Sequence, residues 1–189
     1  MTVRIIGGAW KRSKLPVADR PGLRPTPDRV RVTLFNWLGQ DLSGWRCLDA
    51  FAGAGALGFE AASRGAAEVV LLERDRALVA GLNQTRERLH AAQVRVEGAD
   101  AIGWMARCAP ARFELVFVDP PFDAGLHTAA LAAAARLVVP DGFVYIEAGR
   151  AFGAAEAAEH GLAPWRDGRA GGVHFHLLRR PAVEAFPAG

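Results

Sequence analysis

Cysteine and long apolar runs are both scarce in this sequence of 189 residues. Cys47 and Cys108 are its only cysteines, and two separated thiols make neither a disulfide framework nor a zinc site. No apolar run approaches the ~18–20 residues that a membrane-spanning helix needs, and Met1–Ile6 is too short for the apolar part of a secretory signal. The sequence therefore predicts a cytoplasmic protein with no membrane partner, in which both thiols have packing roles.

The net charge of +3 conceals an uneven distribution of charged side chains. Residues 1–40 hold eight basic and two acidic groups, whereas the other 149 residues hold 15 basic and 18 acidic groups. A basic segment on a mildly acidic body favours a phosphate-rich partner, and Trp10, Phe35 and Trp37 lie among the basic residues. We therefore expect this segment to bind nucleic acid; the alternative is a basic tail that only increases solubility.

From residue 46 the sequence alternates short apolar runs with segments of helical periodicity. The apolar runs predict strands at Cys47–Phe51, Val69–Glu73, Val94–Glu97, Leu115–Asp119 and Phe143–Glu147. Helices are expected between them, at about residues 56–64, 75–90, 100–107, 125–138 and 151–159. Such alternation is typical of an α/β fold, in which helices cover both faces of a mostly parallel sheet.

The end of the chain departs from this alternation. Gly161–Asp167 and Val173–Arg179 flank a glycine-rich turn, which predicts a closing antiparallel hairpin. We expect the chain to comprise a basic N-terminal extension over residues 1–45, a main domain over 46–180 and a frayed tail over 181–189.

We expect the extension to form a short strand or hairpin and a helix that pack on the main domain, and Ile5–Trp10 predicts the strand with a glycine turn. A helix is expected after it, with Thr26 as the N-cap and Pro27 at the first helical position. Asp28 then faces the positive end of the helix dipole, which also favours a helix start here.

Residues 53–58, Gly-Ala-Gly-Ala-Leu-Gly, follow a predicted strand and begin a predicted helix. They match the G-x-G-x-x-G pattern of dinucleotide-binding enzymes, with Glu73 placed 20 positions after Gly53 to bind a ribose. Asp49 argues against NAD, because a carboxylate at the preceding strand end would repel a pyrophosphate. It would attract the sulfonium and ammonium groups of S-adenosylmethionine, which we therefore expect as the cofactor. The alternative is a loop whose glycines only shape a tight turn.

Asp100 follows the third predicted strand, where we expect it to bind the adenine amino group, to cap a helix, or both. The predicted cofactor site contains nine residues near these strand ends, namely Asp49, Phe51, Gly53, Gly55, Gly58, Glu73, Arg74, Asp100 and Ala101.

The fourth predicted strand ends in Asp119-Pro120-Pro121-Phe122, at the sheet edge where α/β proteins bind ligands. Prolines lack backbone donors, so the Asp119 carboxylate and the Pro120 carbonyl remain as acceptors for an exocyclic amine. Phe122 adds a flat ring on which a base can stack. We assign Asp119, Pro120 and Phe122 to the catalytic site, and the alternative is an ordinary turn. Tyr145 and Glu147 end the next strand beside this site, a place that allows a supporting role for which the sequence gives no evidence.

This arrangement resembles the amino-methyltransferases that carry an Asn/Asp-Pro-Pro-aromatic motif, and among them the RsmD family, over about residues 3–180. The matching segments include Arg4-Ile5-Ile6-Gly7-Gly8, Leu23-Arg24-Pro25-Thr26, Asp28-Arg29-Val30-Arg31, Phe51-Ala52-Gly53, Ser63-Arg64-Gly65-Ala66 and Asp119-Pro120-Pro121-Phe122. The sequence departs from the family at Val32, where the family usually has Glu, and at Ala54, where it usually has Ser.

The resemblance implies a Rossmann-like class I methyltransferase that acts on the N2 amine of a guanine in 16S rRNA. The expected substrate is an assembled or assembling 30S ribosomal subunit, the product S-adenosylhomocysteine, the enzyme a monomer, and the reaction free of metal. Seven basic residues are candidates for RNA contacts: Arg4, Lys11, Arg12, Lys14, Arg24, Arg29 and Arg31. The alternative function is a DNA or RNA adenine-N6 methyltransferase.

Overall fold

The structure is a computed structural model that describes residues 1–121 and 125–182. Phe122, which the sequence assigns to the catalytic site, lies outside the described residues, as do residues 183–189 of the predicted tail.

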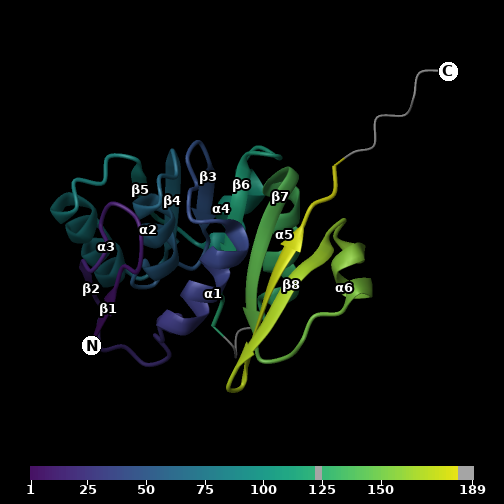
Figure 1. The fold of residues 1–189 in the computed structure, drawn as a ribbon, viewed down its shortest axis with the longest axis horizontal. Coiled ribbons are helices and arrows are strands. Elements are labelled where there is room, and N and C mark those ends of the chain that lie inside the picture. The colour runs from purple at the N-terminus through teal and green to yellow at the C-terminus, as the bar shows by residue number, and fades with distance from the viewer. Residues whose placement is uncertain (122–124, 183–189) are drawn as a thin grey trace.

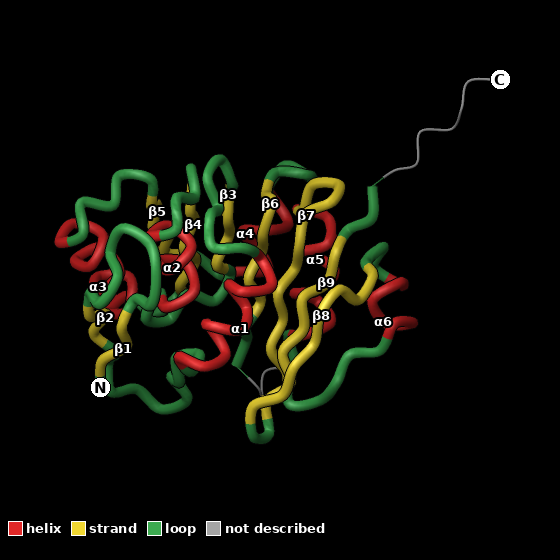
Figure 2. The backbone as a smooth tube through the Cα atoms, in the orientation of Figure 1, coloured by secondary structure: helices red, strands yellow, loops and turns green. Residues whose placement is uncertain are grey.

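Within the described residues, seven strands form one twisted sheet, visible edge to edge in Figure 2. The strands are β3 (Arg46–Asp49), β4 (Glu68–Glu73), β5 (Val94–Gly98), β6 (Phe113–Val118), β7 (Val138–Ala148), β8 (Ala163–Ala170) and β9 (Val173–Arg179). Their order across the sheet is β5-β4-β3-β6-β7-β9-β8, with β3 to β7 parallel and β9 antiparallel to both of its neighbours. The predicted mostly parallel sheet and its closing hairpin are confirmed.

Helices cover both faces of this sheet, as Figure 1 shows. The helices are α1 (Asp28–Leu38), α2 (Ala56–Ser63), α3 (Arg76–Arg88), α4 (Ala101–Arg107), α5 (His127–Leu137) and α6 (Ala154–Glu159). Buried residues of α1, α2 and α3 pack in one hydrophobic cluster, and those of α4, α5 and α6 pack in a second cluster on the other face. The strands β3, β4 and β6 contribute to both clusters, because successive side chains of a strand point to opposite faces.

The N-terminal strands differ from those predicted. β1 (Thr2–Arg4) and β2 (Lys14–Pro16) form a separate antiparallel hairpin. Ile5–Trp10, predicted as a strand with a glycine turn, lies in the loop that joins them, so the predicted strand is wrong and Gly8 falls in the turn. The Ile5 amide donates to the Ser13 carbonyl, but the next amides bond to α2: Ile6 and Gly7 donate to the Glu60 carboxylate, and Ala9 donates to the Ser63 carbonyl. These amide groups therefore bond to α2 and not to a neighbouring strand, and they hold the loop against the C-terminal half of that helix.

The start of α1 also requires a correction. The helix begins at Asp28 with Pro27 in the N-cap position, and Thr26 is not the cap. The Thr26 hydroxyl donates instead to Glu147 Oε1, at 2.8 Å, in the main sheet. The Thr26 hydroxyl thus donates to a distant carboxylate and accepts from no backbone N–H of α1, which links the N-terminal segment to the end of β7.

Arg31 is buried, with no exposed side-chain surface, and this contradicts its assignment as an RNA contact. Its guanidinium donates to the Thr26 and Arg4 carbonyls and to the carboxylates of Asp28 and Glu60. Glu60, equally buried, also accepts from the Arg64 guanidinium at 2.9 and 3.0 Å. The basic charge of Arg31 therefore serves a buried ion cluster that joins the N-terminal segment to α2.

Candidate active site

Acidic side chains gather where β3, β4, β6 and β7 reach their carboxyl ends. Asp49 ends β3 and Glu73 ends β4, while Asp119 directly follows β6. Glu147 lies one residue before the end of β7. Since the four strands are parallel neighbours in the order β4-β3-β6-β7, their carboxyl ends bring all four carboxyl groups to the same edge of the sheet.

Asp49 is almost completely buried, at 2% exposure. Its Oδ2 accepts a hydrogen bond of 3.0 Å from the amide of Gly58, in the first turn of α2. A Cβ at Gly58 would lie 2.1 Å from the Leu71 side chain, so only glycine permits this close approach of helix and sheet. Burial raises the pKa of Asp49 to about 7, and the nearby Glu73 and Glu147 carboxylates add to the rise.

Asp119 is half-buried, and its pKa lies well above its usual value. Loss of hydration is the largest cause, followed by the charges of Glu147 and Asp49. Its neighbour Pro120 is buried. Asp119 is therefore a stronger base than an ordinary surface carboxylate.

Glu147 is the residue of this edge to which the sequence assigned no role. It is 5% exposed, and its Oε1 accepts from the hydroxyls of Thr26 and Tyr145, each at 2.8 Å. Burial raises the pKa of Glu147, although both hydroxyls oppose that rise. One signal in the sequence pointed to it: Glu147 ends an apolar run, as Asp49, Glu73 and Asp119 do.

The glycine loop is held by Glu73 and by its own backbone conformation. Glu73 Oε2 accepts from the Gly53 amide at 3.1 Å, and Oε1 accepts from the Asp75 amide at 2.9 Å. Gly53 and Gly55 have φ angles of 54° and 80°, a region that favours glycine. Glu73 therefore fixes the loop in addition to its predicted contact with a ribose, which stays a prediction.

The remaining predicted cofactor residues lie around this loop with different exposures. Asp100 caps α4, because its Oδ2 accepts from the Gly103 amide at 2.8 Å, which confirms the capping role. Its side chain is on the surface beside the buried Ala101, while Phe51 is half-buried and Arg74 is exposed. Contact of these residues with an adenine stays a prediction.

The chemistry of this edge suits a cation. Among the residues described, no basic side chain forms an ion pair with Asp49, Asp119 or Glu147. A cavity of about 170 Å³ lies between the glycine loop, α3 and residues 16–18, and none of the four acidic residues contributes to its wall. Partly desolvated carboxylates beside a glycine loop fit a positively charged nucleoside better than a phosphate.

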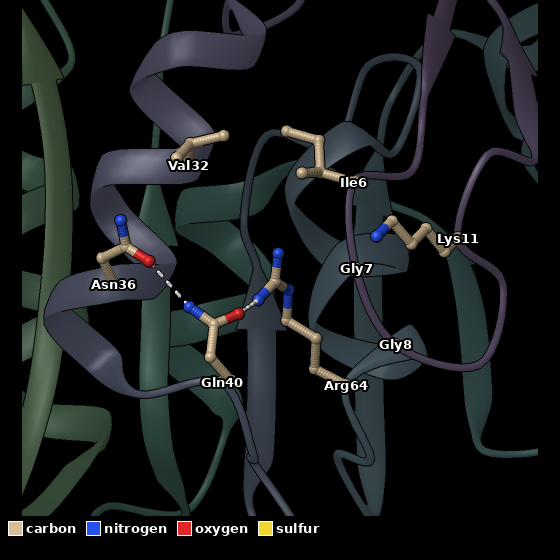
Figure 3. A pocket seen from close by; sticks show the side chains of 8 residues that line it. All are labelled: Ile6, Gly7, Gly8, Lys11, Val32, Asn36, Gln40 and Arg64. Carbon is tan, nitrogen blue, oxygen red and sulfur yellow. Dashed lines mark hydrogen bonds between the residues drawn. The ribbon is translucent and has the colours of Figure 1, made fainter.

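Six of the seven basic residues assigned to RNA are exposed: Arg4, Lys11, Arg12, Lys14, Arg24 and Arg29. A second cavity, of about 310 Å³, lies between α1 and the loop that joins β1 to β2. Figure 3 shows Lys11 on one side of this cavity and Val32 and Asn36 on the opposite side, with Arg64 and Gln40 at one end. Val32, one of the two departures from the expected family pattern, is 41% exposed at this rim.

The free energy of unfolding is expected to depend on pH through Asp49. Its pKa is raised from 3.8 to about 7 in the folded chain, so its contribution to stability is complete below pH 4 and is lost as pH rises through 7. Asp49→Asn, which stays neutral, should match the wild type at pH 4 and exceed it at pH 8 by up to about 4 kcal/mol. Urea unfolding at pH 4, 6 and 8 measures this difference.

Glu159→Gln is the matched control, because Glu159 is an exposed carboxyl at the end of α6. Its pH profile should follow that of the wild type. Parallel profiles for Asp49→Asn and the wild type would contradict the assignment of a raised pKa to Asp49.

In the part of the chain that the structure describes, no helix is both long and apolar enough to cross a membrane. The same part contains no group of three His, Cys, Asp or Glu side chains arranged to hold a metal ion.

Comparison with known proteins identifies close relatives along nearly the whole chain. The family described as Conserved hypothetical protein 95 matches residues 3–179. The chain is 42% identical to ribosomal RNA small subunit methyltransferase D of Escherichia coli (strain K12), over 95% of this chain and 91% of that protein. It is 40% identical to the protein of the same name from Haemophilus influenzae, over 77% of this chain and 78% of the relative.

A solved structure described as the putative methyltransferase yhhF from Escherichia coli has the same fold. It gives a TM-score of 0.82 at 39% identity, covering 97% of this chain and all of that one. The architecture is therefore that of the class I methyltransferases, with a mostly parallel sheet and a C-terminal antiparallel hairpin.

Proposed function

Because this chain belongs to the RsmD family, we propose that it transfers a methyl group from S-adenosylmethionine to the N2 amine of a guanine in 16S rRNA. The names of its relatives support a ribosomal RNA methyltransferase of the small subunit. The class I methyltransferase fold supports the use of S-adenosylmethionine.

One observation supports an amine as the methyl acceptor. Asp119 and Pro120 lie at the carboxyl edge of the sheet, between Asp49 and Glu147. The Asp119 carboxylate and the Pro120 carbonyl accept hydrogen bonds, and Pro120 has no N–H to compete. Guanine presents N–H donors at N1 and N2, whereas the ring nitrogen N1 of adenine is an acceptor. An edge lined with acceptors thus favours guanine.

S-adenosylmethionine supplies an electrophilic methyl group on its sulfonium. In our proposal Asp49 attracts its positive charge, Glu73 binds the ribose, and the loop of Gly53, Gly55 and Gly58 lets the backbone approach closely. Phe51, Arg74, Asp100 and Ala101 complete this site around the adenine.

Asp119 has two tasks in the proposed reaction. Its hydrogen bond to the N2 amine holds the nitrogen lone pair in line for transfer, and positioning of this kind supplies much of the rate. When N2 gains the methyl group it releases one proton, which passes to the Asp119 carboxylate. The raised pKa of Asp119 suits this second task, because a base works best when its pKa lies near the working pH. Phe122 would hold the base by stacking.

The six exposed basic residues supply phosphate contacts in this proposal: Arg4, Lys11, Arg12, Lys14, Arg24 and Arg29. A target guanine must leave its stack to reach the sheet edge. The short extension offers little surface for reading sequence, so we propose that a monomer acts on an assembled or assembling 30S subunit, whose shape supplies specificity.

Transfer of tritiated methyl groups tests the proposal. We expect incorporation into 16S rRNA within 30S subunits from cells that lack this modification, with weaker labelling of free rRNA and none of DNA. Digestion of the labelled RNA to nucleosides should yield N2-methylguanosine. Labelled N6-methyladenine in DNA or RNA would instead establish the alternative, an adenine-N6 methyltransferase.

A further inference from the structure

We propose that Glu147 determines specificity for guanine by accepting a hydrogen bond from N1–H of the target base, while Asp119 and Pro120 hold the N2 amine. This inference rests on the proposed function, because it takes guanine as the base that enters the site. A carboxylate oxygen only accepts hydrogen bonds. It therefore attracts the N1–H of guanine and repels the N1 lone pair of adenine.

The first support is the position of Glu147. β6 and β7 are parallel neighbours that pair Val118 with Ile146. The next residue of each strand, Asp119 and Glu147, thus reaches the same edge of the sheet. Desolvation raises the pKa of Asp119, and the nearby charge of Glu147 raises it further, which agrees with this placement.

The second support is that the two carboxylate oxygens of Glu147 differ in their hydrogen-bond partners. Oε1 accepts both hydroxyls, from Thr26 before α1 and from Tyr145 on β7. Among the described residues, none donates a hydrogen bond to Oε2. Two partners from separate segments fix the side chain through Oε1, and neither of them bonds to Oε2. Such support by neighbouring groups is what a precise recognition contact requires.

A competing interpretation is that Glu147 only fastens Thr26, and with it the start of α1, to the sheet. The two interpretations predict different results with altered bases. A fastening role lowers transfer to every base by the same factor, whereas an N1–H contact changes the ratio between bases that have N1–H and bases that lack it.

The test replaces the target guanine, once mapped, by 2,6-diaminopurine or by 2-aminopurine in reconstituted 30S subunits. Both analogues keep the N2 amine and lack N1–H, but they differ from each other at position 6. For the wild type we expect kcat/KM to fall by about 10–100-fold with both analogues, because a buried acceptor loses its donor. Equal rates on guanine and both analogues would overturn the inference without any variant.

Glu147→Gln provides the second arm. Its amide oxygen can still accept the hydroxyls of Thr26 and Tyr145, while its N–H₂ group replaces Oε2 and donates. We expect transfer to guanine to fall and the preference for guanine over 2,6-diaminopurine to shrink at least about tenfold. A variant that loses activity equally on both bases contradicts the inference and supports the fastening role.

Glu156→Gln is the matched control, because Glu156 pairs with Arg150 at the surface of α6. It should leave both rates and their ratio unchanged. Thermal unfolding and calorimetric binding of S-adenosylhomocysteine check that Glu147→Gln remains folded. If the wild type labels no guanine N2 at all, the proposed function fails; if it labels guanine but the base ratios do not respond, only the Glu147 inference fails.

Discussion

Asp119→Ala is expected to lower kcat for RNA methylation by about 10²–10³-fold. The substitution removes the acceptor that positions the N2 amine and the base that takes its proton, and loss of one such positioned group has effects of this size. Single-turnover transfer of tritiated methyl groups to 30S subunits measures the change. If the variant methylates RNA at near the wild-type rate, the proposed role of Asp119 is wrong.

The same substitution has an expected effect on stability in the opposite direction. Asp119 is partly desolvated beside Glu147 and Asp49, so its ionised form is unfavourable in the folded chain. We expect Asp119→Ala to be at least as stable as the wild type at pH 8. Asp119→Asn, which keeps one acceptor oxygen, should retain more activity than Asp119→Ala. A large loss of stability in both variants would assign Asp119 a structural role instead.

Glu60→Ala is expected to destabilise the fold by about 3–5 kcal/mol, because it leaves the buried guanidinium groups of Arg31 and Arg64 without their shared carboxylate. It also removes the acceptor for the amides of Ile6 and Gly7. Urea unfolding and the melting temperature measure this loss, and a drop of roughly 10 °C is expected for a chain of this size.

Glu156→Ala is the control for this prediction. Its ion pair with Arg150 lies at the surface, so its loss should cost less than about 1 kcal/mol. Glu60→Gln, which keeps one acceptor oxygen for the loop amides but not the charge, should fall between the two. Equal stability of Glu60→Ala and Glu156→Ala would show that the buried cluster contributes no more than a surface pair.

Much of the fold was predictable because it depends on local patterns. Apolar runs such as Leu115–Asp119 and the glycine loop at residues 53–58 identified the parallel strands and the first strand–helix turn. The hairpin before the C-terminal tail was also correct, although β8 extends to Ala170 and leaves a shorter turn than predicted. Residues Ile5–Trp10 have a β-like sequence pattern, but they form no strand, because the amides of Gly7 and Ala9 donate hydrogen bonds to α2.

The sequence by itself determined the chemistry available at the site. Asp49, Glu73 and Asp119 each follow an apolar run, and parallel strands place such positions at one edge, so their proximity followed from the pattern alone. Only the tertiary structure decided which partners the other polar groups have. Arg31 is adjacent to exposed basic residues in the sequence but is buried with Glu60, and Thr26 bonds to Glu147, 121 positions away. Contacts between distant segments depend on how the helices pack on the sheet, and no local pattern of residues records that packing.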